Sequence, residues 1–153
     1  MEAYSPGLSR LKMYCDRIQK KLINPKPKIK DIKITNSISL IDADNSIGFV
    51  AADFGIKHAI HNAKKTGSGL VGIKNSGHYG LSGYYAEQAV KKNLIAMIFT
   101  NAPPAVAPHG SLKSLFGTNP ICFGCPSGSK IPFIFDSSIS VSYTHLRAHE
   151  TGW

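Results

Sequence analysis

The stretch KNSGHYGLSGYY, residues 74–85, places one histidine on a glycine-flanked turn between an apolar run and a segment with helical spacing. Before it, Gly69–Ile73 has the pattern of a short buried strand. His78 is therefore predicted at the carboxyl end of a strand, where glycines let the backbone bend sharply and a ligand approach closely. Because histidine titrates near neutral pH, we interpret His78 as a candidate proton-transfer residue. A capping or core histidine is the alternative. After the turn, apolar residues recur at roughly helical intervals, at Tyr84, Ala86, Ala89 and Val90.

The segments around this turn alternate between helical and extended patterns. Leu8–Leu22 has apolar residues at the spacing of an amphipathic helix, and Asn24–Pro27 ends it. Phe49–Lys65 has a second helical pattern, which Thr66 and Gly67 stop. The other predicted features are extended segments at Ile29–Ile34, Ile38–Ile41, Gly69–Ile73, Leu94–Phe99, Pro120–Phe123 and Ile131–Phe135, a turn at Asp42–Ser46 and a long exposed loop at Asn101–Gly110.

Three patterns look like known sites but lack the context that those sites need. Gly67–Gly72 spells GxGxxG, yet it follows a predicted helix and opens a strand, whereas a dinucleotide fingerprint follows a strand and opens a helix. Cys122–Cys125 spells CxxC without a second pair, and positions three apart on a strand face opposite sides, which favours core packing over zinc or redox chemistry. His58 and His61 lie three apart on a predicted helix, and we interpret them as a solvated helix face. No metal site is predicted.

Composition bounds the class of protein. At 153 residues with 42% hydrophobic content, the chain can bury a core and form one domain. Its formal net charge is +9, with six lysines between positions 20 and 33, so nucleic acid is a rival partner. The cluster lacks interleaved aromatic residues, and a basic field also attracts anionic cofactors and carboxylates, so we predict no nucleic-acid partner. No apolar run approaches the roughly 20 residues that span a bilayer, and no leader pattern is present, so we predict a cytoplasmic protein with no membrane partner.

Four motifs in order carry a resemblance to one family. They are the turn around His78, the loop Asn101–Pro108, the GTNP tetrapeptide Gly117–Pro120 and the segment Asp136–Ser138. Together they resemble the malate/L-lactate dehydrogenase family of the second, non-Rossmann type, which also includes ureidoglycolate, sulfolactate and diketogulonate dehydrogenases. The resemblance implies an α/β fold with a mixed, largely antiparallel sheet flanked by helices. It also implies NAD or NADP as cofactor, a small 2-hydroxy or 2-oxo acid as substrate, and a homodimer in the full-length protein.

The resemblance also implies a role for particular residues. His78 is the expected catalytic residue, Arg10 offers a bidentate partner for a substrate carboxylate, and Tyr14 shares its helix face one turn later. Pro6 stands where the family motif has a histidine, and proline can transfer no proton. Serines replace the Met and Ala of the usual DMATS text after Asp136. The expected substrate-binding residues are Ser5, Arg10, Tyr14, Thr118 and Asn119, and the expected cofactor-binding residues are Asn101, Ala102, Asp136, Ser137 and Ser138.

Family members are considerably longer, so we expect an incomplete chain: a partial helical segment over residues 1–28 and a partial cofactor- and substrate-binding domain over residues 29–140. Residues 141–153 resemble one reading frame of a sequencing adapter, and we set them apart as a non-native tail. The leading hypothesis is a fragment of an NAD(P)-dependent 2-hydroxy acid dehydrogenase, inactive alone. The alternatives are a fold remnant that acts as a binding piece and a basic nucleic-acid-binding protein.

Overall fold

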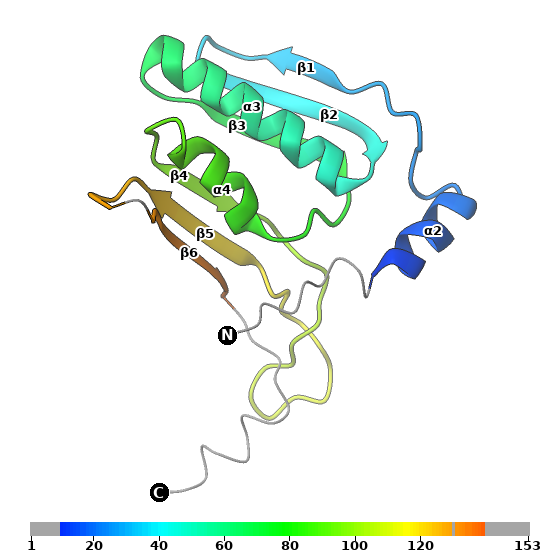
Figure 1. Ribbon diagram of the computed structural model, residues 1–153. Coiled ribbons are helices and arrows are strands. Elements are labelled where there is room, and N and C mark those ends of the chain that lie inside the picture. The colour runs from blue at the N-terminus through cyan, green and yellow to red at the C-terminus, as the bar shows by residue number, and fades with distance from the viewer. Residues whose placement is uncertain (1–9, 130, 140–153) are drawn as a thin grey trace, which may run out of the picture.

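The computed structural model describes residues 10–129 and 131–139, which form two three-stranded sheets, each covered by a helix (Figure 1). Helices and strands alternate along the chain, as the sequence patterns predict. Their order is α2 (Leu11–Gln19), β1 (Lys30–Lys33), β2 (Ile38–Ser46), α3 (Gly48–Thr66), β3 (Leu70–Ser76), α4 (Ser82–Val90), β4 (Ala96–Phe99), β5 (Pro120–Cys125) and β6 (Phe133–Ser138).

The first sheet has the order β1-β2-β3 and is mixed. β1 pairs antiparallel with β2, and β2 pairs parallel with β3. Parallel neighbours need a crossover connection, and α3 supplies it, packing on one face of this sheet (Figure 1). α3 ends where Gly67 takes a positive φ of 85° and donates its N–H to the Ala63 carbonyl. A Cβ on Gly69 would overlap the Ala59 carbonyl, so glycine is needed for the chain to turn back along the helix.

The second sheet, β4-β5-β6, is antiparallel throughout, and α4 packs against it. Its core consists of small side chains: Ala86 and Ala89 of α4, Ala96 of β4 and Cys122 of β5. Small residues let the helix approach the strands closely, and Gly124 completes this contact because a Cβ there would lie 3.1 Å from Val90. The two sheets together confirm the predicted mixed, largely antiparallel α/β fold, although as two separate sheets.

The predicted turn at Asp42–Ser46 is wrong as a strand boundary, because β2 continues to Ser46. The pairing with β3 is irregular between Asp42 and Ser46, where Asp44 and Asn45 have positive φ values of 50° and 54°. The strand bends there but resumes its pairing when Ser46 meets Ser76. Polar side chains hold the bend, since the Asp44 carboxylate accepts hydrogen bonds from the Asn24 side chain and the backbone N–H of Lys28.

The predicted helix at Leu8–Leu22 is present over Leu11–Gln19, and residues 1–9 lie outside the described part of the chain. Its apolar face is mostly solvent-exposed: Leu11 is 57% exposed, whereas Tyr14 is buried at 6%. Tyr14 therefore anchors α2 to the rest of the molecule. Within the described ranges, no helix is both long and apolar enough to cross a membrane.

Candidate active site

His78 lies directly after β3, on the turn that joins this strand to α4. The turn packs against the first residue of α3. A Cβ on Gly48 would overlap the carbonyl oxygens of Gly77 and His78, so a residue with a side chain there would push the turn away. The pairing of Ser46 with Ser76 brings the end of β2 to the same place. The backbone of His78 is thus fixed by the parallel strand pair and by the start of α3.

The side chain of His78 contacts two aromatic rings from different elements. Tyr14 of α2 places its Oη 2.6 Å from His78 Nδ1. Phe49 of α3 meets both rings edge-on, with centroid distances of 5.5 Å to Tyr14 and 6.4 Å to His78. Gly80 leaves room for the Phe49 ring, because a Cβ on Gly80 would lie 2.7 Å from Cε1 of Phe49. The imidazole is therefore held at Nδ1 by a hydrogen bond and on its side by an aromatic ring.

Burial and charge set the protonation states in this group. Burial lowers the pKa of His78 from its ordinary 6.5, and the positive charges of Arg10 and Arg17 lower that pKa further. Burial raises the pKa of Tyr14 above 10.0, and the same two arginines oppose that rise. At neutral pH the imidazole is consequently neutral and the phenol keeps its proton. A neutral imidazole is the form that can accept a proton from a substrate.

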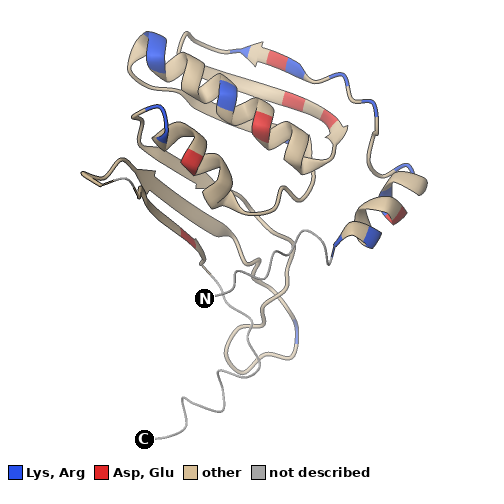
Figure 2. Ribbon diagram, in the orientation of Figure 1, with Lys and Arg blue, Asp and Glu red and all other residues tan. Residues whose placement is uncertain are grey.

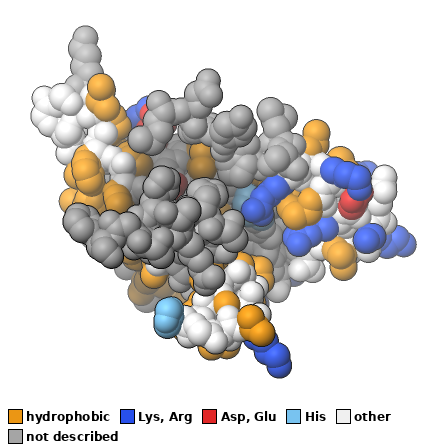
Figure 3. Space-filling view, turned by 90° about the horizontal axis from the view of Figure 1, so that it is seen from below, with side chains coloured by type: hydrophobic (Ala, Val, Ile, Leu, Met, Phe, Trp, Pro, Cys, Tyr) orange, Lys and Arg blue, Asp and Glu red, His pale blue; other side chains and the backbone are white. Residues whose placement is uncertain are grey.

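Two arginines of the α2 region give this site a positive field. Arg10 immediately precedes α2 and Arg17 lies in its last turn. Figure 2 shows basic residues along α2 and the segment that leads to β1. Seen from below, basic side chains gather at the α2 end of the molecule, and hydrophobic side chains are exposed at the opposite end (Figure 3). Such a field favours an anionic ligand such as a carboxylate.

A second group of expected site residues lies around the GTNP segment. Asn119, with a positive φ of 38°, accepts a hydrogen bond at Oδ1 from the backbone N–H of Ala102, at 2.9 Å. A Cβ on Gly117 would overlap the Ala102 carbonyl, so the two loops touch through backbone. Thr118 accepts at its carbonyl oxygen from the N–H of Ile139. The structure thus brings Ala102, Thr118 and Asn119 together, although the sequence assigned them to different ligands.

Asp136 has a defined partner. Its Oδ2 accepts a 2.7 Å hydrogen bond from the backbone N–H of Gly83, in the first turn of α4. Ser137 donates from Oγ to the Ser138 carbonyl at 3.3 Å. Ser138 and Ser137 pair with Pro120 and Ile121 across β5, which places them beside the GTNP segment. Asp136 therefore supports the helix that follows the His78 turn.

The expected site residues fall into two groups that α4 connects. Over residues 10–129 and 131–139, no hydrogen bond joins His78 or Tyr14 directly to Ala102, Asn119 or Asp136. The link is indirect: the His78 turn leads into α4, and α4 is held by Asp136. Ser5 lies outside the described residues.

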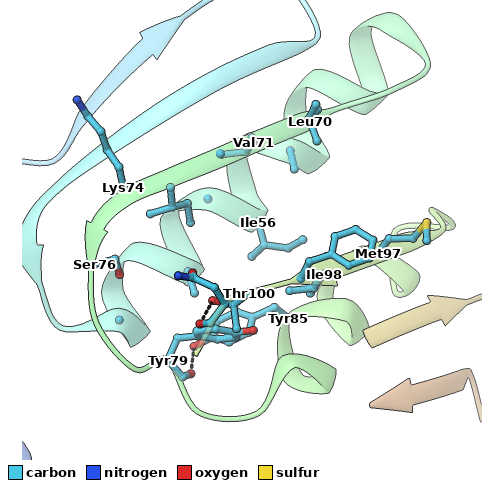
Figure 4. Close-up of a pocket in the computed structure, with 18 of the residues that line it drawn as sticks. Ile56, Leu70, Val71, Lys74, Ser76, Tyr79, Tyr85, Met97, Ile98 and Thr100 are labelled. Carbon is cyan, nitrogen blue, oxygen red and sulfur yellow. Dashed lines mark hydrogen bonds between the residues drawn. The ribbon is translucent and has the colours of Figure 1, made fainter. Parts of the chain in front are cut away.

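A cavity of about 520 Å³ separates the two sheets (Figure 4). Its walls come from α3, β3, the His78 turn and β4, and they include Gly77, Tyr79 and Asn101. The side chain of His78 does not line it, although both of its chain neighbours do. Tyr85 donates from Oη to the Tyr79 carbonyl at 2.7 Å, and burial raises the pKa of Tyr85 to about 12. This cavity therefore adjoins the His78–Tyr14 pair without containing it.

Among the patterns set aside as misleading, Cys122 packs in the core as predicted, whereas the prediction of a solvated helix face is wrong for His58, which is partly buried. His58 stacks on Phe54 and lies 3.2 Å from an Asp31 carboxylate oxygen, whereas His61 is exposed. Cys122 is buried in the core and is not disulfide-bonded. In the described part of the chain, no three histidine, cysteine, aspartate or glutamate residues are grouped as metal ligands.

Sequence reasoning identified His78, Tyr14 and Arg10 but missed three residues that shape their surroundings. Arg17 lies seven residues after Arg10, about two helical turns, so its presence on the same face was readable from spacing. Phe49 and Gly48 gave no local signal, because their importance depends on where α3 begins relative to a turn thirty residues away. Only the parallel pairing of β2 with β3 brings them there.

Comparison with known proteins now identifies the family. A family model described as malate/L-lactate dehydrogenase matches residues 1–150. The chain belongs to this family. The matched span includes the first ten residues of the segment set apart as a non-native tail, so that separation stays a prediction.

Individual members of the malate/L-lactate dehydrogenase family are similar over most of the chain. The malate dehydrogenase of Pyrococcus abyssi is 43% identical over 137 residues, which is 90% of this chain and 38% of that protein. The ureidoglycolate dehydrogenase (NAD(+)) of Escherichia coli is 33% identical over 138 residues, 90% of this chain and 40% of that protein. The solved malate dehydrogenase of Pyrococcus horikoshii superposes with a TM-score of 0.83 at 42% identity, over 90% of this chain and 39% of that one. The chain thus spans about two fifths of the length of these relatives.

Relatives in the family use NAD or NADP. The expected cofactor residues Ser137 and Ser138 carry neutral hydroxyls, and the side-chain amide nitrogen of Asn119, a residue expected to bind substrate, is a neutral donor on the neighbouring segment. Neutral donors and acceptors of this kind fit the carboxamide and ribose hydroxyls of a nicotinamide nucleotide. Asp136 fits less well, because its carboxylate already accepts the Gly83 N–H.

Proposed function

We propose that this chain is the part of an NAD(P)-dependent 2-hydroxy acid dehydrogenase that supplies the proton-transfer histidine, His78, for a substrate of the malate or lactate type. The observation that carries the proposal is the 2.6 Å hydrogen bond between Tyr14 Oη and His78 Nδ1 on a turn fixed by two elements. It leaves Nε2 as the nitrogen that can face a substrate. Family membership supports the reaction class, and the lowered pKa of His78 supports the direction of proton transfer.

Oxidation of a 2-hydroxy acid requires the hydroxyl proton to leave as the carbonyl forms. When bound, a nicotinamide supplies the acceptor for the hydride from the same carbon. His78 accepts the hydroxyl proton at Nε2, which requires the tautomer in which Nδ1–H donates to Tyr14 Oη. In the reverse direction the imidazolium returns that proton to the 2-oxo group. Tyr14 thus fixes the orientation of the ring, and its hydroxyl can accept the hydrogen bond that this tautomer of the base donates.

The second requirement is to neutralise the negative charge of the substrate, and we assign this role to Arg10. A 2-hydroxy acid carries a carboxylate beside the reacting carbon, and guanidinium groups bind carboxylates through two parallel hydrogen bonds. Arg10 acts electrostatically on both Tyr14 and His78, as the lowered His78 pKa indicates. Arg17 adds to the same field from the last turn of α2.

The relevant experiment builds a complete enzyme around this segment. Residues 10–139 replace the matched segment of the Pyrococcus horikoshii malate dehydrogenase, and NAD(P)-dependent malate oxidation is measured. We expect activity in this chimera and a loss of about 100-fold or more in kcat for His78→Gln. His61→Gln, an exposed histidine of α3, is the matched control and should leave kcat unchanged.

Two outcomes would count against the assignment. One is a His78→Gln chimera that keeps kcat within about twofold of its parent, because loss of an acid–base residue usually lowers the rate by about 10²- to 10⁴-fold. The other is an equal loss for His61→Gln, which would indicate general damage. Extending the transplanted segment to residues 1–139 brings Pro6 into the chimera and shows whether the histidine that it replaces is needed.

A further inference from the structure

α2 stands apart from both sheets, although it carries Tyr14, the hydrogen-bond partner of His78. No Cα atom of α2 lies within 8 Å of a Cα atom of another described helix or strand, and Figure 1 shows the helix to one side of the sheets. Tyr14 is the one buried residue of α2. Packing between elements therefore does little to fix this helix, yet Tyr14 Oη lies 2.6 Å from His78 Nδ1. Another set of contacts must hold α2 in place.

The segment that follows α2 is bound to the bend of β2 by three hydrogen bonds. The backbone N–H of Asn24 donates to the Asn45 carbonyl at 2.9 Å, and the Asn24 side-chain amide donates to Asp44 Oδ2 at 2.9 Å. The backbone N–H of Lys28 donates to the same carboxylate oxygen at 3.0 Å. We refer to these three contacts as the clamp. Two prolines lie between the donors and restrict the backbone, so the clamp holds a stiff segment.

The same bend also holds the strand that leads to His78. Asp42 Oδ1 accepts a hydrogen bond from the side-chain amide of Asn75 at 2.9 Å, and Asp42 Oδ2 lies 3.4 Å from Lys74 Nζ. Asn75 has a positive φ of 53° and precedes His78 by three residues. These contacts fix the end of β3 against the bend. The bend of β2 is therefore the common attachment of the α2 segment and of the His78 turn.

The backbone of the bend adopts a conformation that needs support. Asp44 and Asn45 are consecutive residues with positive φ values of 50° and 54°. This left-handed conformation costs free energy for residues other than glycine, and aspartate and asparagine tolerate it better than most. It persists where the surrounding contacts over-determine it, and such positions cluster where function depends on geometry. The bend thus has a defined shape, which can fix two elements relative to each other.

We propose that Asp44 is a positioning residue of the active site, whose carboxylate sets where Tyr14 lies relative to His78 by clamping the segment after α2 to the bend of β2. Without the clamp, α2 moves away from the turn and the hydrogen bond between Tyr14 and His78 is lost. The structural part of this proposal is independent of the reaction. Its effect on catalysis rests on the proposed function of His78.

The titration of His78 in the 153-residue chain measures the position of α2. NMR follows the imidazole signal with pH, and His78→Gln identifies it among the six histidines. Burial and then the charges of Arg10 and Arg17 lower the pKa of His78, and its contact from α3, Phe49, is uncharged. Displacement of α2 should therefore raise the midpoint. Loss of the negative charge of Asp44 would by itself lower the midpoint, so a rise reports movement of the helix.

Two substitutions of Asp44 separate the clamp from general damage. Asp44→Gly removes the carboxylate and tolerates the positive φ, so the chain should fold with the His78 midpoint at higher pH. Asp44→Asn keeps an oxygen that can accept from both donors and should not raise the midpoint. Asp31→Ala removes a carboxylate of β1 that lies beside His58, and this control should leave His78 unchanged. If Asp44→Gly does not fold, Asn24→Ala removes a donor from the other side of the clamp and should raise the midpoint.

Malate oxidation by the chimera provides the catalytic readout. Asp44→Gly should raise KM for malate by about 10-fold or more, because Arg10 loses its place beside the substrate carboxylate, whereas Asp44→Asn should stay within about threefold of the parent.

The proposal is overturned if Asp44→Gly lowers the unfolding midpoint but leaves the titration of His78 unchanged. It is also overturned if Asp44→Asn behaves like Asp44→Gly, or if Asp31→Ala shifts the His78 midpoint equally. A chimera whose kcat survives His78→Gln, while the titration in the 153-residue chain responds to Asp44→Gly as expected, would refute the proposed function and leave the clamp standing.

Discussion

At the scale of single residues, His78 depends on groups from three separate elements. Tyr14 comes from α2, Phe49 and Gly48 come from α3, and the turn itself follows β3. The hydrogen bond to Nδ1 orients the ring, and burial, followed by the charges of Arg10 and Arg17, lowers the pKa of the imidazole. The chemistry of one side chain is therefore set by contacts that span more than sixty residues of sequence.

Tyr14→Phe in the chimera isolates the effect of the Tyr14–His78 hydrogen bond. The ring and its packing against Phe49 remain, but the hydroxyl partner of Nδ1 is lost. We expect kcat for malate oxidation to fall about 3- to 10-fold, the usual worth of one hydrogen bond, with little change in KM or in the unfolding midpoint. Steady-state kinetics and denaturant unfolding check both parts. An unchanged kcat would remove the orienting role from Tyr14.

Gly48→Ala tests the contact that positions the His78 turn. A Cβ at this position would overlap the carbonyls of Gly77 and His78, so we expect destabilisation of about 1–3 kcal/mol. Gly83→Ala is a matched control in the first turn of α4, where the nearest atom would be 3.4 Å from the new Cβ. It should be neutral or slightly stabilising, because alanine favours helix. Equal effects on the unfolding free energy in both variants would refute the steric explanation.

At this scale, the sequence predicted the role of a residue where the chemistry of its side chain and its local spacing pointed to the same role. His78 stands out between glycines, and Arg10 and Tyr14 share a helix face. Phe49 and Gly48 could not be predicted in this role, because an apolar residue and a glycine at a helix start are common everywhere. Their function arises from a parallel strand pairing that local patterns do not reveal.

At the scale of elements, α4 connects the two groups of site residues. It begins four residues after His78, and Asp136 of β6 accepts a hydrogen bond from its first turn. A carboxylate at the start of a helix satisfies an otherwise unpaired N–H and interacts favourably with the helix dipole. Asp136 therefore contributes to the position of the His78 turn from a distance.

Asp136→Ala should lower the free energy of unfolding by about 1 kcal/mol, the usual cost of losing a helix cap. Asp53→Ala is the control, since Asp53 is a partly exposed residue of α3 paired with Lys57 one turn later. That substitution should cost less than about 0.5 kcal/mol. Chemical denaturation of the two variants distinguishes them. If Asp136→Ala is as mild as Asp53→Ala, Asp136 does not support α4, and its family role toward the cofactor is the better account.

Element boundaries were predictable wherever a stop signal was local. Gly67 ends α3, and the alternation of apolar residues located most strands. The continuation of β2 through Asp42–Ser46 was missed because this polar segment has the composition of a turn. Its pairing partner β3 and the hydrogen bonds of Asp44 keep it in the sheet, and both are non-local.

At the scale of the whole molecule, residues 10–129 and 131–139 form two sheets whose facing edges are not paired with each other across the cavity. The chain spans about two fifths of the length of its relatives. The contacts of His78 with Tyr14 and Phe49 are made within the described residues, whereas the space between β3 and β4 is not filled by them. The fold class followed from the resemblance, but the separation into two sheets did not, because sequence patterns identify strands and not their neighbours.

We expect the 153-residue chain alone to show no measurable oxidation of NADH or NADPH with pyruvate or oxaloacetate. The reason is that the cavity beside the His78 turn is open and the histidine of the family motif is replaced by Pro6. A spectrophotometric assay at high protein concentration suffices. Robust oxidation that His78→Ala abolishes would show that the chain is complete enough for catalysis.

The pH dependence of kcat/KM for malate oxidation by the chimera tests the central claim, that His78 accepts the substrate proton. A base must be neutral, so activity should fall as the pH drops through the folded pKa of His78, which burial and then Arg10 and Arg17 lower below 6.5. The account predicts an acid limb with its midpoint below 6.5, moved to higher pH by Arg17→Gln, which removes one of those charges. A pH profile without that acid limb would contradict the account. So would a chimera in which Arg17→Gln leaves the midpoint unchanged and His78→Gln retains activity.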